Sequence, residues 1–210
     1  MTNAARRARE ELANCLSHGA GALAAVAATP ILVVGAAARG TAADIVGAAV
    51  FGASMILLYA ASAWYHAVPD GPLRRRLRRL DHAAIYILIA GTYTPFTLGV
   101  LGGAWGWTLF GIVWGAAAIG VYHKLAAGVR YPRLSTVLYL LMGWLVVIAA
   151  RPLVEAVPPG GLLLLLAGGL AYTGGVAFYV ARRPWTHLVW HLFVLTGTAC
   201  HFLAVLWYAA

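Results

Sequence analysis

The chain has 210 residues, of which 62% are hydrophobic and 10% are charged. Its mean hydropathy is +0.82, whereas a soluble globular domain is roughly half apolar and about a quarter charged. This composition excludes a chain that folds in water. The length leaves room for seven membrane-spanning helices and no separate soluble domain, because each span needs about 20 residues. The excess of 15 Lys and Arg over 6 Asp and Glu is explained by membrane orientation, so we expect no nucleic-acid partner.

Seven apolar stretches, each long enough to cross a bilayer, alternate with short connections that carry Gly, Pro or Arg. We therefore predict an all-α integral membrane protein with one domain, residues 1–210, whose first part, residues 1–13, is a short basic segment. The predicted spans are Asn14–Ala38, Ala42–His66, Asp81–Gly99, Ala104–Lys124, Leu134–Ala150, Gly161–Ala181 and Trp185–Tyr208. In the sixth span, four glycines are expected to let helices pack closely: Gly168, Gly169, Gly174 and Gly175.

Basic residues divide into two unequal sets when they are assigned to alternate ends of these spans. One set has 13 members and the other has only Arg39 and Arg151. Because connections rich in Lys and Arg stay in the cytoplasm, we predict that the N-terminus is inside and the C-terminus outside. The larger set is Arg6, Arg7, Arg9, Arg74, Arg75, Arg76, Arg78, Arg79, Lys124, Arg130, Arg133, Arg182 and Arg183.

Six of the seven histidines lie within about two helical turns of the predicted cytoplasmic span ends, and only His201 lies deeper. Ionisable side chains are costly in lipid and usually face a bundle interior, so this cluster indicates a site. Ser62 and His66 are four residues apart and share one helix face, as do His187 and His191. The His187 and His191 pair alone is equally compatible with a metal ion and with helix packing. A third histidine at the same depth favours a catalytic zinc site with three protein ligands.

Further polar residues lie near these histidines along the chain. Asp81 opens the third predicted span, where its carboxylate could hydrogen-bond a metal-bound water or orient a histidine. Its neighbour His82 is expected to face away, since successive helical residues do not share a face. Glu11, Asn14 and His18 form one stripe by their spacing of three and four, and we interpret them either as a helix entry or as an outer wall of the site.

Taken together, these motifs resemble the bacterial hemolysin III proteins, which belong with the progestin and adiponectin receptors. The motifs that carry the resemblance are Glu11-Leu-Ala-Asn14-Cys-Leu-Ser-His18, Ser62-Ala-Trp-Tyr-His66, Leu80-Asp81-His82 with Gly91-Thr-Tyr-Thr-Pro-Phe96, and His187-Leu-Val-Trp-His191 with His201-Phe202. They cover nearly the whole chain in the expected order. The resemblance implies a protein of the bacterial inner membrane with one Zn²⁺ near the cytoplasmic face, bound by His66, His187 and His191.

The resemblance also implies a chemistry. Similarity to receptors with ceramidase-like activity, and to alkaline ceramidases, suggests a zinc-dependent hydrolase whose substrate is a membrane lipid amide or ester. Asp81 would then be the general base, and Ser62 would donate a hydrogen bond to the developing oxyanion. Two alternatives remain: a non-enzymatic sensor or regulator held together by a structural zinc, and a cytolytic protein. The chain lacks the long N-terminal cytoplasmic region of the animal receptors, so the partner binding of those receptors does not transfer to it, and its protein partners stay unknown.

Overall fold

The computed structural model describes residues 2–181 and 183–209. Met1, Arg182 and Ala210, which belong to the predicted domain, lie outside the described residues. Within the described part, all regular structure is helical and no residue forms a strand. In chain order the elements are α1 (Asn3–Arg39), α2 (Ala42–Ala67), α3 (Pro72–Pro95), the π-helix η1 (Phe96–Leu101), α4 (Gly103–Ala127), α5 (Pro132–Gly143), the 3₁₀-helix η2 (Leu145–Ala149), α6 (Ala150–Ala156), α7 (Pro159–Ala181) and α8 (Thr186–Tyr208).

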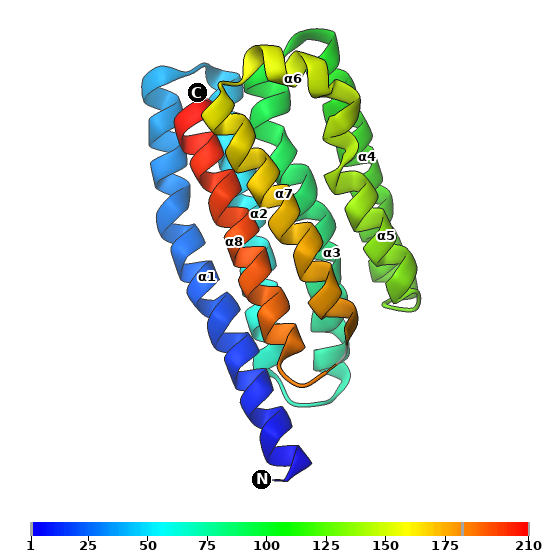
Figure 1. Ribbon diagram of the computed structural model, residues 1–210. Helices are drawn as coiled ribbons and strands as arrows, with labels where there is room; N and C mark the ends of the chain where they lie inside the picture. Colours follow the sequence, from blue (N-terminus) through cyan, green and yellow to red (C-terminus); the bar gives the residue numbers. More distant parts are fainter. Residues whose placement is uncertain (1, 182, 210) are drawn as a thin grey trace.

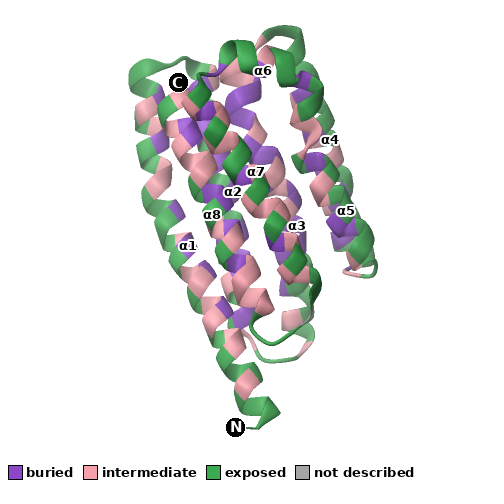
Figure 2. Cartoon of the chain, viewed as in Figure 1, coloured by how far each residue is buried: buried purple, intermediate pink, exposed green. Residues whose placement is uncertain are grey.

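Seven helical segments of the described residues are long and apolar enough to cross a membrane. This confirms the prediction of an all-α protein with seven membrane spans. Exposed residues occur along the length of every long helix (Figure 2), and many of them are large and apolar; Leu23, Ile119 and Leu163, for example, are exposed by 67 to 75%. Such a surface is unfavourable in water and is the surface that lipid requires.

Two helices extend beyond the predicted spans. α1 begins at Asn3, so most of the predicted basic segment 1–13 is helical. α3 begins at Pro72, so the arginine run 74–79 lies on a helix and not in a connection. Both stretches are rich in Arg, Ala or Leu, which are strong helix formers, and Pro72 occupies the first helical position where proline is favoured. The hydrophobic pattern does not detect these extensions because they carry charge and extend past the apolar run.

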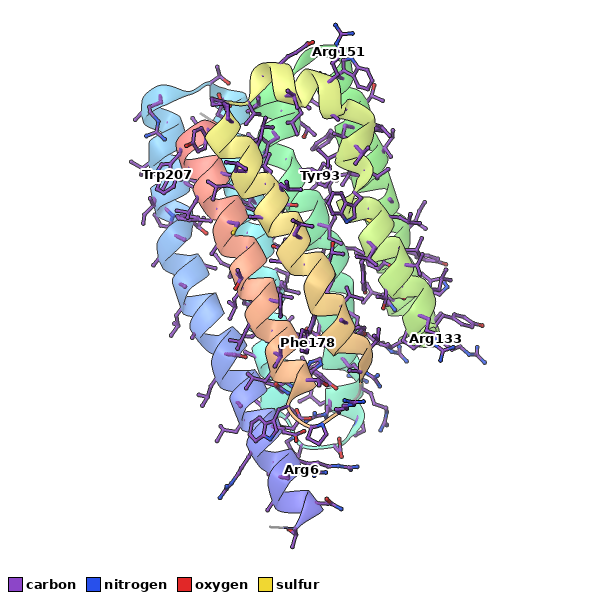
Figure 3. All side chains as sticks on the ribbon, viewed as in Figure 1. Arg6, Tyr93, Arg133, Arg151, Phe178 and Trp207 are labelled. Atoms are coloured by element: carbon purple, nitrogen blue, oxygen red, sulfur yellow. The ribbon has the colours of Figure 1, made fainter. Side chains whose placement is uncertain are left out.

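The helices form a ring in which α1 packs against both α2 and α8. α2 packs on α3, α3 on α4, and α7 on α8, whereas α5 meets α7 over only a short stretch. In Figure 1, α4 and α5 stand to one side of the other helices, and the two termini lie at opposite ends. We call the end that carries Arg6, Arg78 and Arg133 the basic end. Figure 3 shows Arg6 and Arg133 at that end and Arg151 at the other.

The fifth span is interrupted near its middle. α5 ends at Gly143, and the chain continues as η2. The hydroxyl oxygen of Tyr93 on α3 lies 2.9 Å from the Met142 carbonyl oxygen and 2.7 Å from that of Gly143. The same oxygen accepts a hydrogen bond from the Val146 N–H at 3.0 Å. Backbone groups inside a membrane need partners within the protein, so Tyr93 stabilises the interruption.

We expect Tyr93→Phe to lower stability by about 1–3 kcal/mol, because it leaves the Val146 N–H without its acceptor. The measurement is the unfolding midpoint in a dodecyl sulfate titration, followed by circular dichroism. Tyr122→Phe is the matched control, since Tyr122 is 75% exposed on α4. Equal midpoints for the two variants would show that Tyr93 does not stabilise the interruption.

Candidate metal centre

Three imidazoles converge near the basic end of the bundle. His66 is the penultimate residue of α2, and His187 and His191 lie in the first two turns of α8. The centroid of the His66 ring is 5.1 Å from the centroids of the His187 and His191 rings, which are themselves 4.7 Å apart. One ligand nitrogen from each lies within 4.8 Å of the others. The structure therefore brings together the three histidines that the sequence analysis selected.

The chemistry of this set fits a transition-metal ion. Nε2 of His66 is buried and has no hydrogen-bond partner among the described residues, a state that costs about 1–3 kcal/mol unless a ligand occupies it. His191 is 1% exposed, so water does not compete strongly there. Zinc with nitrogen ligands at about 2.0–2.1 Å separates them by about 3.3 Å in a tetrahedron. A small inward movement of the rings would bring the three nitrogens to that spacing.

α1 fixes the orientation of His66. Nδ1 of His66 donates to Glu11 Oε2 at 2.7 Å, and Arg74 Nη2 lies 2.6 Å from the same oxygen. The Arg74 guanidinium also lies over the Tyr65 ring, 4.7 Å from its centroid. Because Nδ1 carries the proton in this contact, the lone pair is on Nε2, which is the nitrogen available to a metal.

α1 fixes His191 in the same way through Ser17, a residue that the sequence analysis missed. The Ser17 hydroxyl donates to the Asn14 carbonyl at 2.9 Å, so its oxygen is free to accept from His191 Nδ1 at 3.0 Å. Nε2 of His191 is then the free lone pair. A signal existed in the sequence, because Ser17 lies three residues after Asn14 on the stripe already recognised.

The three residues of that stripe lie at the site. Glu11 binds His66, and Asn14 is 4% exposed beside it. The His18 ring stacks on the His191 ring with centroids 3.5 Å apart and an angle of 6° between planes. Both His18 ring nitrogens are buried and have no hydrogen-bond partner in the described part of the chain. Of the two interpretations left open, the geometry fits a wall of the site.

Asp81 and Ser62 also lie beside the histidines. Asp81 is 7% and Ser62 is 1% exposed, and both line one cavity with His187 and His191. The expectation that His82 faces away from Asp81 is wrong, since Asp81 Oδ2 and His82 Nδ1 are 3.3 Å apart. Adjacent helical residues differ by about 100° around the axis, but here the ends of the two side chains approach each other, although only Asp81 lines the cavity.

The cavity that begins at these residues has a volume of about 120 Å³ and extends between α3, α5, α7 and α8. A second cavity of about 180 Å³ adjoins it in the opposite half of the bundle. A third space of about 670 Å³, which we call the polar hollow, lies on the basic side of the histidines. The first two cavities share Thr92, Tyr93, Gly143, Trp144, Gly169 and His201. The first cavity and the polar hollow share Thr136, Tyr179 and His187.

Glycines shape the two apolar cavities. Close packing is confirmed at Gly168, where a Cβ would collide with His201, and at Gly175, where it would lie 2.7 Å from Phe193 Cβ. The prediction of close packing is wrong at Gly169, because a Cβ there would meet no atom within 4 Å. The same is true of Gly143 on α5. These two glycines line both apolar cavities, so they leave room where the cavities adjoin, a region that we call the passage.

The fold and the site define the class: a seven-helix membrane bundle with a buried histidine cluster at one end. A family model described as "Haemolysin-III related" matches residues 6–202, and the chain belongs to this family. It is 43% identical over 209 residues to "Hemolysin-3" of Bacillus cereus, with 99% of this chain and 95% of the relative covered. It is 45% identical over 201 residues to "Hemolysin-3 homolog" of Bacillus subtilis (strain 168), with 95% and 94% covered. A more distant relative is the human "Monocyte to macrophage differentiation factor", 28% identical over 212 residues, with 93% and 83% covered.

We expect the purified protein to retain about one transition-metal ion per chain, held by the three converging nitrogens. His66→Ala, His187→Ala and His191→Ala should each remove most of that metal, as measured by mass spectrometry of chelator-free preparations. His123→Ala, an exposed position on α4, is the control. A wild-type protein without metal, or a His187→Ala variant that keeps it, would contradict the assignment.

The Glu11 contact generates a separate expectation. Glu11→Ala should weaken metal binding about 10- to 100-fold, because His66 loses the partner that fixes its tautomer and ring orientation. Glu11→Gln should lose less, since its amide oxygen can still accept from Nδ1. The measurement is competition with a chelator of known affinity, with Glu10→Ala as the adjacent control. If Glu11→Ala and Glu10→Ala behave alike, Glu11 does not position the ligand.

Proposed function

We propose that this protein is a zinc-dependent membrane hydrolase that acts on an amide or ester bond of a lipid. One observation carries the proposal. Asp81 and Ser62 lie at the same end of an apolar cavity as His187 and His191. A hydrolase for lipids needs this combination, because the reacting carbonyl must meet polar groups while the acyl chain stays out of water.

Zinc is the metal that this ligand set favours. Three neutral imidazoles with no fourth side chain in the cluster that the described residues form are typical of catalytic zinc, whereas structural zinc is usually closed by four protein ligands. A bound Zn²⁺ would polarise the carbonyl and make a bound water more acidic. His66, His187 and His191 would hold it.

The remaining chemistry belongs to Asp81 and Ser62. Asp81 would take a proton from the water that attacks the carbonyl carbon, and would return it to the amine or alcohol that leaves when the C–N or C–O bond breaks. Ser62 would donate a hydrogen bond to the carbonyl oxygen as negative charge develops there. The acyl chain would lie in the apolar cavity, along the passage at Gly143 and Gly169.

Cytolysis, which the names of the bacterial relatives express, receives less support. An aqueous pore needs a continuous polar lining, whereas the cavity beyond the histidines is lined largely by apolar side chains such as Leu88, Leu140 and Val194. A sensor with a structural zinc would use the same histidines but has no need for Asp81 beside them. The activity measurement below separates the sensor from the hydrolase.

We expect Asp81→Asn to keep its zinc and lose turnover, because the amide has nearly the same volume as the carboxylate but cannot accept the proton. The assay follows fatty acid released from ceramide-like and ester lipids in detergent or liposomes. Asp70→Asn is the control, since Asp70 lies in the exposed connection between α2 and α3.

Two results would count against this proposal. Wild-type turnover that does not exceed the His191→Ala background on any lipid class would favour the sensor with a structural zinc. Full activity of Asp81→Asn would leave a hydrolase but remove Asp81 as its base.

We also propose that the basic end faces the cytoplasm of a bacterium, so that the zinc site lies near the cytoplasmic face of the inner membrane. Alkaline phosphatase, a reporter that is active only outside the cytoplasm, should then be active when it is fused after Ala210. The same reporter inserted at Gly128, between α4 and α5, should be inactive. A C-terminal fusion that is active only in the cytoplasm would overturn the orientation.

A further inference from the structure

The polar hollow opens the metal centre toward the basic end. Its lining includes His66 and His187 of the metal centre, together with charged side chains from α1, α3 and α5. It meets the apolar cavity at Thr136, Tyr179 and His187. A charged space and an apolar space therefore meet at His187, with His66 on the charged side and His191 on the apolar side, which is the order of polarity along an amphiphile.

The acidic residues of the hollow already have partners. Glu11 accepts from His66 and lies 2.6 Å from Arg74. Glu10 forms an ion pair with Arg6 at 3.7 Å.

Two arginines that line the hollow, unlike its two glutamates, form no ion pair among the described residues. Arg78 on α3 and Arg133 on α5 both line it, yet neither forms an ion pair with any carboxylate of the described residues. The hollow therefore has two positive charges without a compensating negative charge from the described part of the chain.

Membrane orientation alone accounts for basic residues at this end, but it does not account for where these two lie. Arg75 and Arg76 carry the same charge on the same helix and do not line the hollow. Arg78 lies three residues before Asp81, and Arg133 lies three residues before Thr136. Each arginine is thus about 4.5 Å along its helix axis from a residue that lines the apolar cavity.

We propose that the polar hollow binds the phosphate group of an anionic amphiphile, held by Arg78 and Arg133, while the acyl chain of that molecule occupies the apolar cavity. Guanidinium groups bind phosphate through paired, charge-assisted hydrogen bonds. A spacing of about 4.5 Å along the helix axis suits a molecule in which only a few bonds separate the phosphate from the acyl carbonyl. This inference rests on the proposed function and names the headgroup of its substrate, since a neutral lipid would leave both arginines unpaired.

The test compares two ligands that the proposed hydrolase cannot cleave. They are a radiolabelled long-chain alkyl ether of glycerol phosphate and the same ether without the phosphate, each bound to the protein in maltoside micelles. We expect the phosphate ether to bind at least about tenfold more tightly than the neutral ether, because charge-assisted hydrogen bonds are the strong ones. Inorganic phosphate is the third arm and should compete only weakly, because it lacks the chain.

The variants assign the preference to the two arginines. Arg78→Gln and Arg133→Gln together should reduce the phosphate preference to about twofold or less, whereas Arg75→Gln should keep it. The neutral ether should bind all of these proteins equally, which reports that the apolar cavity is intact.

Three results would overturn the inference: equal binding of the two ethers by wild type, a preference that survives in the double variant, and inorganic phosphate competing as well as the phosphate ether. Failure of the proposed function is distinguishable, because this measurement involves no turnover. A protein that binds the phosphate ether but hydrolyses no lipid would keep this site and lose the hydrolase. A protein that hydrolyses neutral lipids without phosphate preference would keep the hydrolase and lose this phosphate site.

Discussion

The hydrogen bond from His66 Nδ1 to Glu11 is the contact on which the site depends. An imidazole in a membrane helix finds no hydrogen-bond partner in lipid, so a polar group from a neighbouring helix stabilises it and fixes its orientation. α1 supplies those groups to two different helices, through Glu11 to α2 and through Ser17 to α8. This explains why α1 packs against both α2 and α8, and why its polar stripe continues into what hydropathy alone treats as a charged tail. In both contacts the nitrogen left over is Nε2, so one helix orients two of the three converging imidazoles.

The interruption of the fifth span and the apolar path are one feature. Tyr93 satisfies the backbone where α5 ends, and the same side chain lines both apolar cavities. Gly143 and Trp144, which lie at the interruption, line them too, and Gly169 faces the passage from α7 without filling it. Here α5 approaches α7 only briefly. Loose packing at this point is therefore built from specific residues, and a larger side chain at Gly143 or Gly169 would extend into the passage.

Sequence reasoning reached the fold and the three converging histidines because both depend on short-range patterns. Apolar runs of about 20 residues define membrane spans, and a spacing of four places His187 and His191 on one face. What it missed depends on tertiary structure. Ser17 meets His191 across 174 positions of the chain, and no local period encodes that contact. The helical arginine run 74–79 escaped because hydropathy measures insertion into lipid, not helix formation. The Asp81 and His82 contact escaped because the rule for successive residues concerns Cβ directions and not the reach of long side chains.

The depth of the histidines follows from the chemistry proposed for them. His66 lies one residue from the end of α2, and His187 one residue from the start of α8, so the cluster is placed where the polar hollow gives way to the apolar cavity. A site deeper in the bundle would have to import water through apolar space, where it has few hydrogen-bond partners. A site closer to the surface would leave much of an acyl chain in water, which is unfavourable in proportion to its exposed area. The boundary between the two spaces is the position at which water and a lipid carbonyl can meet, and Asp81 and Ser62 lie at that boundary.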